Sequence, residues 1–406
     1  MRSRSSLVLL LGLASCGRLL GIDDLKGPPD GPVQTPDVPG PAVDCKAQRA
    51  VYVVAGTGGL AWFTLAWPAP YVITNFDVKF AYDTPSSAKD VTSATGHPLY
   101  TRRLGSRALW EGLGADPQPT AFVAGNNETH TQQPQSIALN GGIGLAAAGT
   151  VLQAQLQPKF AALAISPAGP YGTATGAPAL VSVNNVDGAV AVFHNMVTPD
   201  VEQQLRPSAA QLASYLPPGG ATVETTLANE LAFTANAFRL GLLGTVILPA
   251  FNDDPHGAFT SGAPTQRMNN LATMLDAFYR DLSMSSEMSC GRGGGFLSLA
   301  DNVVMVVLGD TPKNSFDNVG WADGTPGNAN VMYLRSNGFT RPGWFGQLQP
   351  NLRTSFNPVT GALDPNATAA SCTAAAYASV LYAITRGNKG AITPYTTAAF
   401  DGAILR

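Results

Sequence analysis

The sequence predicts an α/β fold with a mainly parallel central sheet and helices on both faces of that sheet. Several short apolar runs are continuous rather than alternating, which is typical of strands that are buried on both faces. Helical patterns separate these runs, and an alternation of strands and helices favours parallel strands joined by crossover helices. Together, these two observations define the expected fold class.

The first expected strand is residues 50–54, which runs directly into a glycine turn at 56–59. Further strands are expected at residues 120–123, 160–165, 180–183, 189–193, 244–248 and 302–308. Apolar residues at three-to-four spacing predict two of the helices. One stripe consists of Leu227, Leu231, Phe238 and Leu242, and the other of Met268, Leu271, Leu275, Phe278 and Leu282.

The first sixteen residues carry the clearest functional signal. Arg2 and Arg4 give a basic start, residues 7–13 form an apolar run, and Leu-Ala-Ser-Cys follows at 13–16. This pattern resembles a bacterial lipoprotein signal, in which the thiol of Cys16 is acylated, for example with palmitate, and becomes the new N-terminus. The alternative is an ordinary secretory signal in which Cys16 has no role. The apolar run is shorter than the roughly 20 residues that a membrane-spanning helix needs.

The chain is expected to have a signal peptide at 1–15, a lipidated N-terminus and linker at 16–45, and a single domain at 46–406. The linker is rich in proline and nearly free of large apolar residues, so it cannot bury enough surface to fold. Its prolines favour a semi-rigid spacer that holds the domain away from the bilayer. Gly17 after Cys16 resembles lipoproteins of the outer membrane, facing the periplasm or the cell surface.

The composition excludes one class of partner. Charged residues make up 13% of the chain and the net charge is −3, so there is no basic field to neutralise phosphates. We therefore expect no nucleic-acid partner. The chain contains 43 glycines and 31 prolines, which is typical of a loop-rich protein with a neutral, polar surface.

Three cysteines remain once Cys16 is assigned to lipid: Cys45, Cys290 and Cys372. An oxidising compartment permits one disulfide and leaves one thiol. We favour Cys290 with Cys372, because both lie in the C-terminal half beside glycine-rich or small-residue segments. A disulfide from Cys45 to either partner stays open, and none of the spacings resembles a zinc or thioredoxin motif.

The histidines direct attention to one segment. Of His97, His130, His194 and His256, the last follows the expected strand 244–248, with Asp254 two positions before it. An Asp-x-His there places a carboxylate and an imidazole at the carboxyl edge of the sheet, where open α/β folds bind ligands. Both groups bind zinc or a similar divalent metal. The equal alternative is a polar turn in which Asp254 caps the loop before a helix near Pro264.

The order of the segments resembles a known family. The Asp-x-His and the helix at 271–282 are followed by an apolar run at 303–308, Gly-Asp-Thr-Pro-Lys-Asn at 309–314, Asp-Gly-Thr-Pro-Gly-Asn at 323–328 and a second run at 331–334. This order resembles an exported bacterial family catalogued as domain of unknown function 1501, which is similar in fold to alkaline phosphatases and sulfatases. His97-Pro98-Leu99 and Thr129-His130 also fit, so the resemblance spans about 50–350.

The resemblance implies a metal site, and this sequence departs from it twice. Gly58 stands where the family has an aspartate, and Pro326-Gly327 stand where it has Asp-His. A two-metal site needs several converging carboxylates and imidazoles. We therefore expect no cofactor, or at most a single zinc or manganese ion held by Asp254, His256 and Asp310. Thr57 and Thr311 are candidate hydroxyl nucleophiles by analogy with the superfamily, and ordinary turn residues otherwise.

The sequence therefore predicts a lipid-anchored cell-envelope protein on an alkaline phosphatase-like scaffold. It is expected to be non-catalytic and to bind an envelope protein or a surface glycan, with the membrane as a second partner through its lipid. Trp321 and Trp344 flank the segment of the family's active-site loops and are candidates to line a glycan cleft. The alternative is a metal-dependent hydrolase of phosphate or sulfate esters with a reduced metal site.

Overall fold

The part of the chain described by the computed structural model lies in one unit. Contacts divide the chain into Met1–Asp44 and Cys45–Arg406, and every described residue belongs to the second unit. The described residues are 47–55, 66–68, 91–92, 98–101, 103–104, 107–108, 120–124, 139–165, 171–216, 222–249, 263–287, 297–309, 331–341, 343–349 and 352–405. No helix among them is long and apolar enough to cross a membrane.

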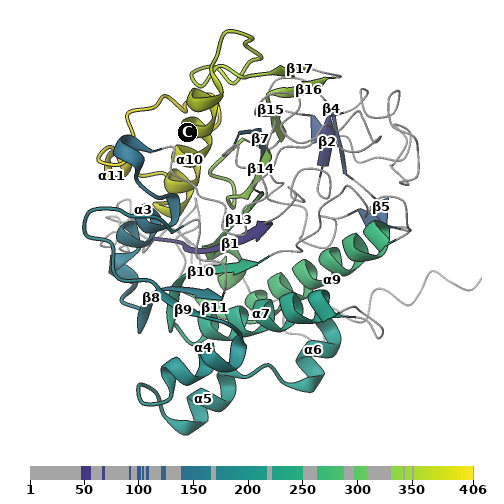
Figure 1. Cartoon of the computed structure of the whole chain (residues 1–406), viewed down its shortest axis with the longest axis vertical. Helices are drawn as coiled ribbons and strands as arrows, with labels where there is room; N and C mark the ends of the chain where they lie inside the picture. Colours follow the sequence, from purple (N-terminus) through teal and green to yellow (C-terminus); the bar gives the residue numbers. More distant parts are fainter. Residues whose placement is uncertain are drawn as a thin grey trace, which may run out of the picture. The chain divides into compact units, whose positions relative to one another are not determined.

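The described strands form a central eight-stranded sheet in the order β15-β7-β14-β13-β1-β10-β8-β9 (Figure 1). Its pairings are parallel except for those of β14, which is antiparallel to β13 and to β7. The prediction of a mainly parallel sheet is confirmed. The strands are β1 (Arg49–Ala55), β7 (Thr120–Val123), β8 (Phe160–Ile165), β9 (Val181–Val183), β10 (Leu243–Pro249), β13 (Val303–Gly309), β14 (Val331–Arg335) and β15 (Gly343–Phe345).

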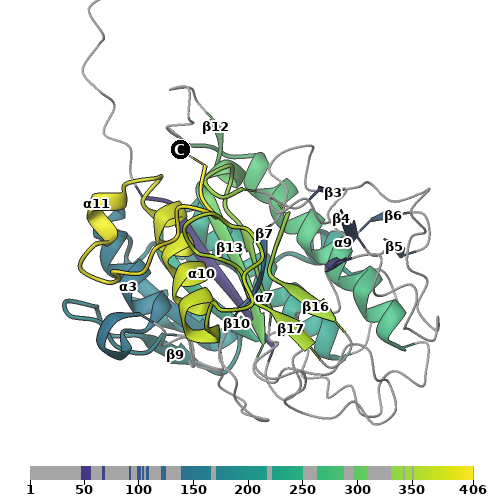
Figure 2. The ribbon, with the colours of Figure 1, turned by 90° about the horizontal axis from the view of Figure 1, so that it is seen from above.

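Helices cover both faces of this sheet, as the sequence predicts. The side chains of Val51 and Val53 belong to one core cluster, and those of Tyr52 and Val54 belong to another, because successive residues of a strand point to opposite faces. The first cluster includes α4 (Val186–Phe193), α5 (Pro199–Leu205), α6 (Ala209–Tyr215), α7 (Thr222–Arg239) and α9 (Ala263–Ser283). The second includes α3 (Leu145–Leu152) and α10 (Ala369–Ile384), which lie across β1 from α9 in Figure 2.

The smaller elements lie outside the central sheet. One three-stranded sheet consists of β2 (Ala66–Pro68), β4 (Pro98–Thr101) and β3 (Val91–Thr92), and three further pairs of described strands form two-stranded sheets. These pairs are β5 (Arg103–Leu104) with β6 (Arg107–Ala108), β11 (Ser286–Glu287) with β12 (Leu297–Ser298), and β16 (Gln347–Gln349) with β17 (Leu352–Thr354). The short helices are η4 (Asn140–Gly142), η5 (Ala154–Leu156), η6 (Leu299–Asn302) and α11 (Lys389–Ile392).

One predicted strand is wrong. Residues 189–193 form the second half of α4, not a strand. The Asn185 side chain accepts a hydrogen bond from the Gly188 backbone N–H and so caps the start of the helix. Val186, Ala189, Val190 and Phe193 are its buried residues, a three-to-four spacing. A short apolar run is compatible with a strand or a helix, and here the cap at Asn185 favours the helix.

The other strand predictions are confirmed in position. Five of the predicted strands coincide with β1 (predicted at 50–54), β7 (120–123), β8 (160–165), β10 (244–248) and β13 (302–308). The sixth, predicted at 180–183, contains β9. The stripe 268–282 lies within α9, and the other stripe lies within α7 except for Leu242, which follows the end of that helix.

Candidate functional site

The carboxyl ends of three neighbouring parallel strands meet at one edge of the central sheet. Val54 of β1 is paired with Pro249, the last residue of β10, and Ala55 is paired with Gly309, the last residue of β13. The chain therefore leaves β10, β1 and β13 at the same level of the sheet. Because β1 lies between the other two strands, the sheet extends in both directions from this point, which is where open α/β sheets bind ligands.

A fourth strand ends at the same edge. β14 is antiparallel to both of its neighbours, and its first residue, Val331, is paired with Val123, the last residue of β7. The segments that follow these four strands therefore all begin at this edge; they are residues 56–65, 125–138, 250–262 and 310–330. Segment 310–330 also leads back to this edge, because it is followed by β14. We refer to this set of strand ends as the carboxyl edge.

The segments that follow the carboxyl edge contain most of the predicted site residues. Thr57 follows β1, Asp254 and His256 follow β10, Asp310 and Thr311 follow β13, and His130 follows β7. All six lie outside the described residues, as do Cys16, Cys290, His97 and Trp321. The predicted metal site and nucleophiles therefore stay predictions, while the strands that lead to them are neighbours in the sheet. Trp344 lies on β15, whose neighbour in the sheet is β7.

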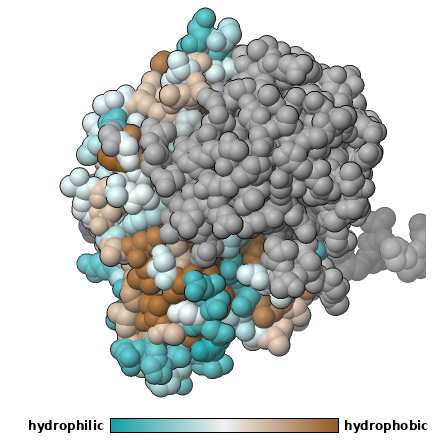
Figure 3. Space-filling view, viewed as in Figure 1, coloured by the Kyte–Doolittle hydropathy of each residue, from teal (hydrophilic) through white to brown (hydrophobic). Residues whose placement is uncertain are grey.

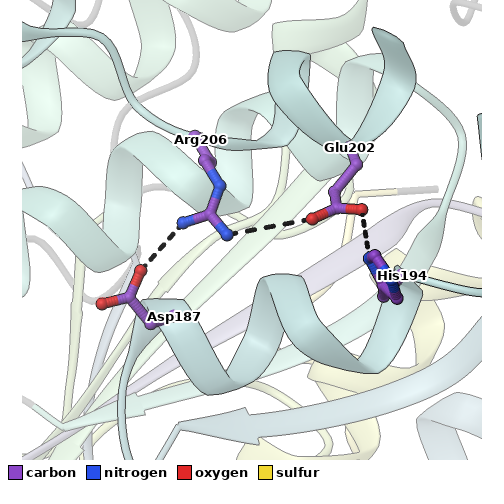
Figure 4. A network of polar contacts seen from close by, with 4 residues as sticks. All are labelled: Asp187, His194, Glu202 and Arg206. Atoms are coloured by element: carbon purple, nitrogen blue, oxygen red, sulfur yellow. Dashed lines mark hydrogen bonds and ion pairs between the residues drawn. The ribbon is translucent and has the colours of Figure 1, made fainter. Parts of the chain in front are cut away.

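His194 is the one predicted candidate histidine within the described residues, and it lies on the surface. Its Nδ1 is 2.8 Å from Oε2 of Glu202, and 68% of its side chain is exposed. Arg206 continues the chain of contacts, with Nη2 3.8 Å from Glu202 Oε1 and Nη1 2.9 Å from Asp187 Oδ1 (Figure 4). Exposed ion pairs of this kind contribute little to stability. The network links α4 to α5 at the surface.

No group of three His, Cys, Asp or Glu side chains suited to a metal ion occurs in the described part of the chain.

The apolar surface beside β9 and α4 in Figure 3 lies next to the hydrophilic surface of α5. Val181 and Val183 of β9 are half-buried and pack against the core cluster beneath them. This surface is therefore the outer margin of the core.

A buried polar cluster joins three helices on the same face. Asp281 of α9 accepts hydrogen bonds from the Tyr215 hydroxyl at 2.9 Å and from Gln211 Nε2 at 2.7 Å, both on α6. Gln211 and Asn236 of α7 exchange amide hydrogen bonds at 3.1 Å. Burial, followed by the nearby Asp281 carboxylate, raises the pKa of Tyr215. The cluster fixes α6, α7 and α9 relative to one another.

The predicted disulfide between Cys290 and Cys372 needs correction. Cys372 carries a free thiol in the structure, is fully buried on α10, and its Sγ donates to the carbonyl oxygen of Phe356 at 3.3 Å. The thiol thus lies in the core cluster beneath the central sheet, where its neighbours are apolar side chains. A free cysteine in such surroundings packs as a small apolar residue.

Sequence reasoning missed a buried carboxyl group. Glu230 of α7 is 2% exposed, and its Oε2 has no hydrogen-bond partner among the described residues. Burial raises the pKa of Glu230 to about 8. A signal for it exists in the sequence, because position 230 lies between Leu227 and Leu231 of the apolar stripe, where a carboxylate is unexpected.

Comparison with known protein families finds no matching family model, and comparison with curated proteins finds no match.

Proposed function

We propose that this protein is a lipid-anchored cell-envelope protein of the outer membrane. In this proposal its domain has an alkaline phosphatase-like scaffold and belongs to the exported family named above. The segments at the carboxyl edge bind an envelope protein or a surface glycan without catalysing a reaction. The lipoprotein-like signal ending at Cys16 and the proline-rich segment after it support the anchor.

The observation that carries the binding site is the register of the central sheet. Pro249, Val54, Ala55 and Gly309 bring the ends of β10, β1 and β13 to one level, and Val123 brings the end of β7 to the same edge. Segments that start from adjacent strand ends can present their side chains to a common ligand. This placement supports the carboxyl edge as the binding surface.

The departures from the family support a non-catalytic role. Gly58 and Pro326-Gly327 replace the residues that the resemblance implies as metal ligands, and glycine and proline side chains offer no metal-binding atom. Dinuclear ester hydrolysis depends on two metal ions that stabilise the attacking and leaving oxygens together. A chain without those ligands retains the scaffold and the loops, which suffice for binding.

The second candidate function is hydrolysis of phosphate or sulfate esters with a single metal ion. The adjacency of β10, β1 and β13 favours it, because Asp254 and His256 follow one of these strands and Asp310 follows another. A bound zinc or manganese ion would supply Lewis-acid polarisation of the ester. Thr57 or Thr311 would then provide the attacking hydroxyl.

Metal analysis separates the two functions. For protein purified without chelator, we expect well under one equivalent of zinc or manganese and no turnover of generic phosphate and sulfate esters. The test variant is the double substitution Asp254→Ala, His256→Ala. The control variant is His194→Ala, which removes an exposed histidine paired with Glu202. One equivalent of metal that disappears in the double variant and persists in His194→Ala would refute the non-catalytic proposal.

A further inference from the structure

Glu230 lies in the layer of helices that covers one face of the central sheet, near the end of β10. Three residues separate α7 from β10, and hydrogen bonds from Gly241 N to Phe238 O and from Leu242 N to Ala237 O close the turn between them. Since α7 packs against β10, the helix runs antiparallel to the strand. Glu230 precedes the last residue of α7 by nine positions, which is about 13 Å of helix, whereas a strand of seven residues spans about 20 Å. Glu230 therefore lies level with the second half of β10.

The surroundings of Glu230 are apolar. Of its neighbours on α7, Leu227, Leu231, Phe233 and Thr234 are buried, whereas Thr226 is exposed, and the apolar ones belong to the same core cluster as α9 and β10. A buried carboxylate without a partner costs several kcal/mol, while the neutral acid costs far less. The packed helix is thus compatible with the protonated side chain and disfavours the ionised one.

Burial raises the pKa of Glu230, and among the described residues no charged group offsets that effect. Asp281 on α9 is held by Tyr215 and Gln211 of α6, and Glu202 on α5 is held by Arg206 and His194. β10 has no titratable side chain. The remaining titratable or charged residues are Glu224 and Arg239 on α7, Arg267, Asp276, Tyr279 and Arg280 on α9, Asp200 on α5, and Asp187 on α4.

We propose that Glu230 makes the packing of α7 against α9 and β10 depend on pH, with the protonated carboxyl group favouring the packed helix and the carboxylate favouring local opening. The inference concerns this domain's own fold and does not rest on the proposed function. Because α7 lies alongside β10, its opening loosens the layer that supports the carboxyl edge.

The direction of the effect follows from the pKa. The ordinary pKa of a glutamate is 4.5, and burial raises that of Glu230 to about 8. The stabilisation that the neutral group provides is complete below about pH 4.5, and it is lost as the pH rises toward the folded-state pKa near 8. For one linked proton, the opening equilibrium shifts about tenfold for each pH unit within this window.

Amide hydrogen exchange of the full-length protein in detergent tests the proposal. Exchange is followed by mass spectrometry from pH 5 to pH 8, with rates corrected for intrinsic pH dependence. We expect the protection of wild-type α7 to fall by about tenfold per pH unit, and the protection of α7 in Glu230→Gln to stay constant. Glu230→Leu provides the same comparison if the amide variant does not fold. Asp200→Asn, which alters an exposed carboxylate, should keep the wild-type pH dependence.

Helix α10, which packs on the other face of the sheet, is the internal reference. We expect its protection to change less than that of α7. Parallel pH profiles in wild type and Glu230→Gln, or an equal loss of protection in α10, would overturn the proposal.

Discussion

Gly402→Ala is expected to destabilise the domain by about 3 kcal/mol or more, because overpacking against backbone atoms cannot be relieved by a side-chain rotation. A Cβ atom at position 402 would lie 2.1 Å from the backbone nitrogen of Gly361 and 2.6 Å from the carbonyl carbon of Thr360. Gly361 itself has a φ of +80°, so this turn has little freedom to move away.

The contact of Gly402 with Gly361 fastens the C-terminal segment to the domain. Gly402 N donates to Pro358 O at 3.0 Å, and Arg341 Nη1 donates to Gly402 O at 2.7 Å. Arg341 N donates to Ala403 O at 2.8 Å. A displaced position 402 therefore disturbs three hydrogen bonds as well as the packing.

Urea unfolding followed by circular dichroism measures the effect of Gly402→Ala. The matched control is Gly390→Ala in α11, where the nearest atom to a new Cβ is Asn388 Oδ1 at 3.5 Å. Alanine is a better helix former than glycine, so the control should be neutral or slightly stabilising. Equal unfolding midpoints for the two variants would show that the close approach at Gly402 is not a constraint.

Asp281→Ala is expected to lower the free energy of unfolding by about 2–4 kcal/mol, because it leaves buried donors without an acceptor. The Tyr215 hydroxyl and the Gln211 amide both donate to Asp281 Oδ2, and Tyr215 is fully buried. Asp281→Asn keeps one carbonyl oxygen and should cost less. Ser283→Ala, at an exposed position of the same helix, is the control and should change stability by less than about 0.5 kcal/mol.

A double-mutant cycle with Tyr215→Phe tests whether the cluster acts as a unit. Removing the hydroxyl and its acceptor together leaves fewer unpaired groups than the sum of the single changes, so the effects on unfolding free energy should be less than additive. Strict additivity of Tyr215→Phe and Asp281→Ala would mean that their 2.9 Å hydrogen bond does not couple α6 to α9.

The sequence is informative about the elements whose apolar residues follow a regular pattern. The continuous runs of β1, β10 and β13 and the stripes of α7 and α9 each identify an element on their own. α10 gives no such stripe, because it is rich in alanine and buried on nearly all sides. The run within α4 fits either a strand or a helix until the cap at Asn185 is recognised.

The candidate site is predictable from the sequence only in part. The position of Asp254 and His256 after an expected strand places them at an edge of the sheet. That β10 and β13 flank β1 does not follow from any local pattern, because strand neighbours far apart in sequence are set by tertiary packing. The burial of the Glu230 carboxyl group, whose Oε2 has no hydrogen-bond partner among the described residues, likewise depends on how the other helices pack against α7.

The anchor is the central claim, and it is tested most directly by the mass of the N-terminal peptide of protein purified from membranes. We predict a peptide that begins at Cys16 and carries diacylglycerol on its thiol, and we predict that Cys16→Ser leaves the membrane fraction. A mature chain that begins at another residue, or an unmodified Cys16 in membrane-bound protein, would contradict a lipid-anchored protein.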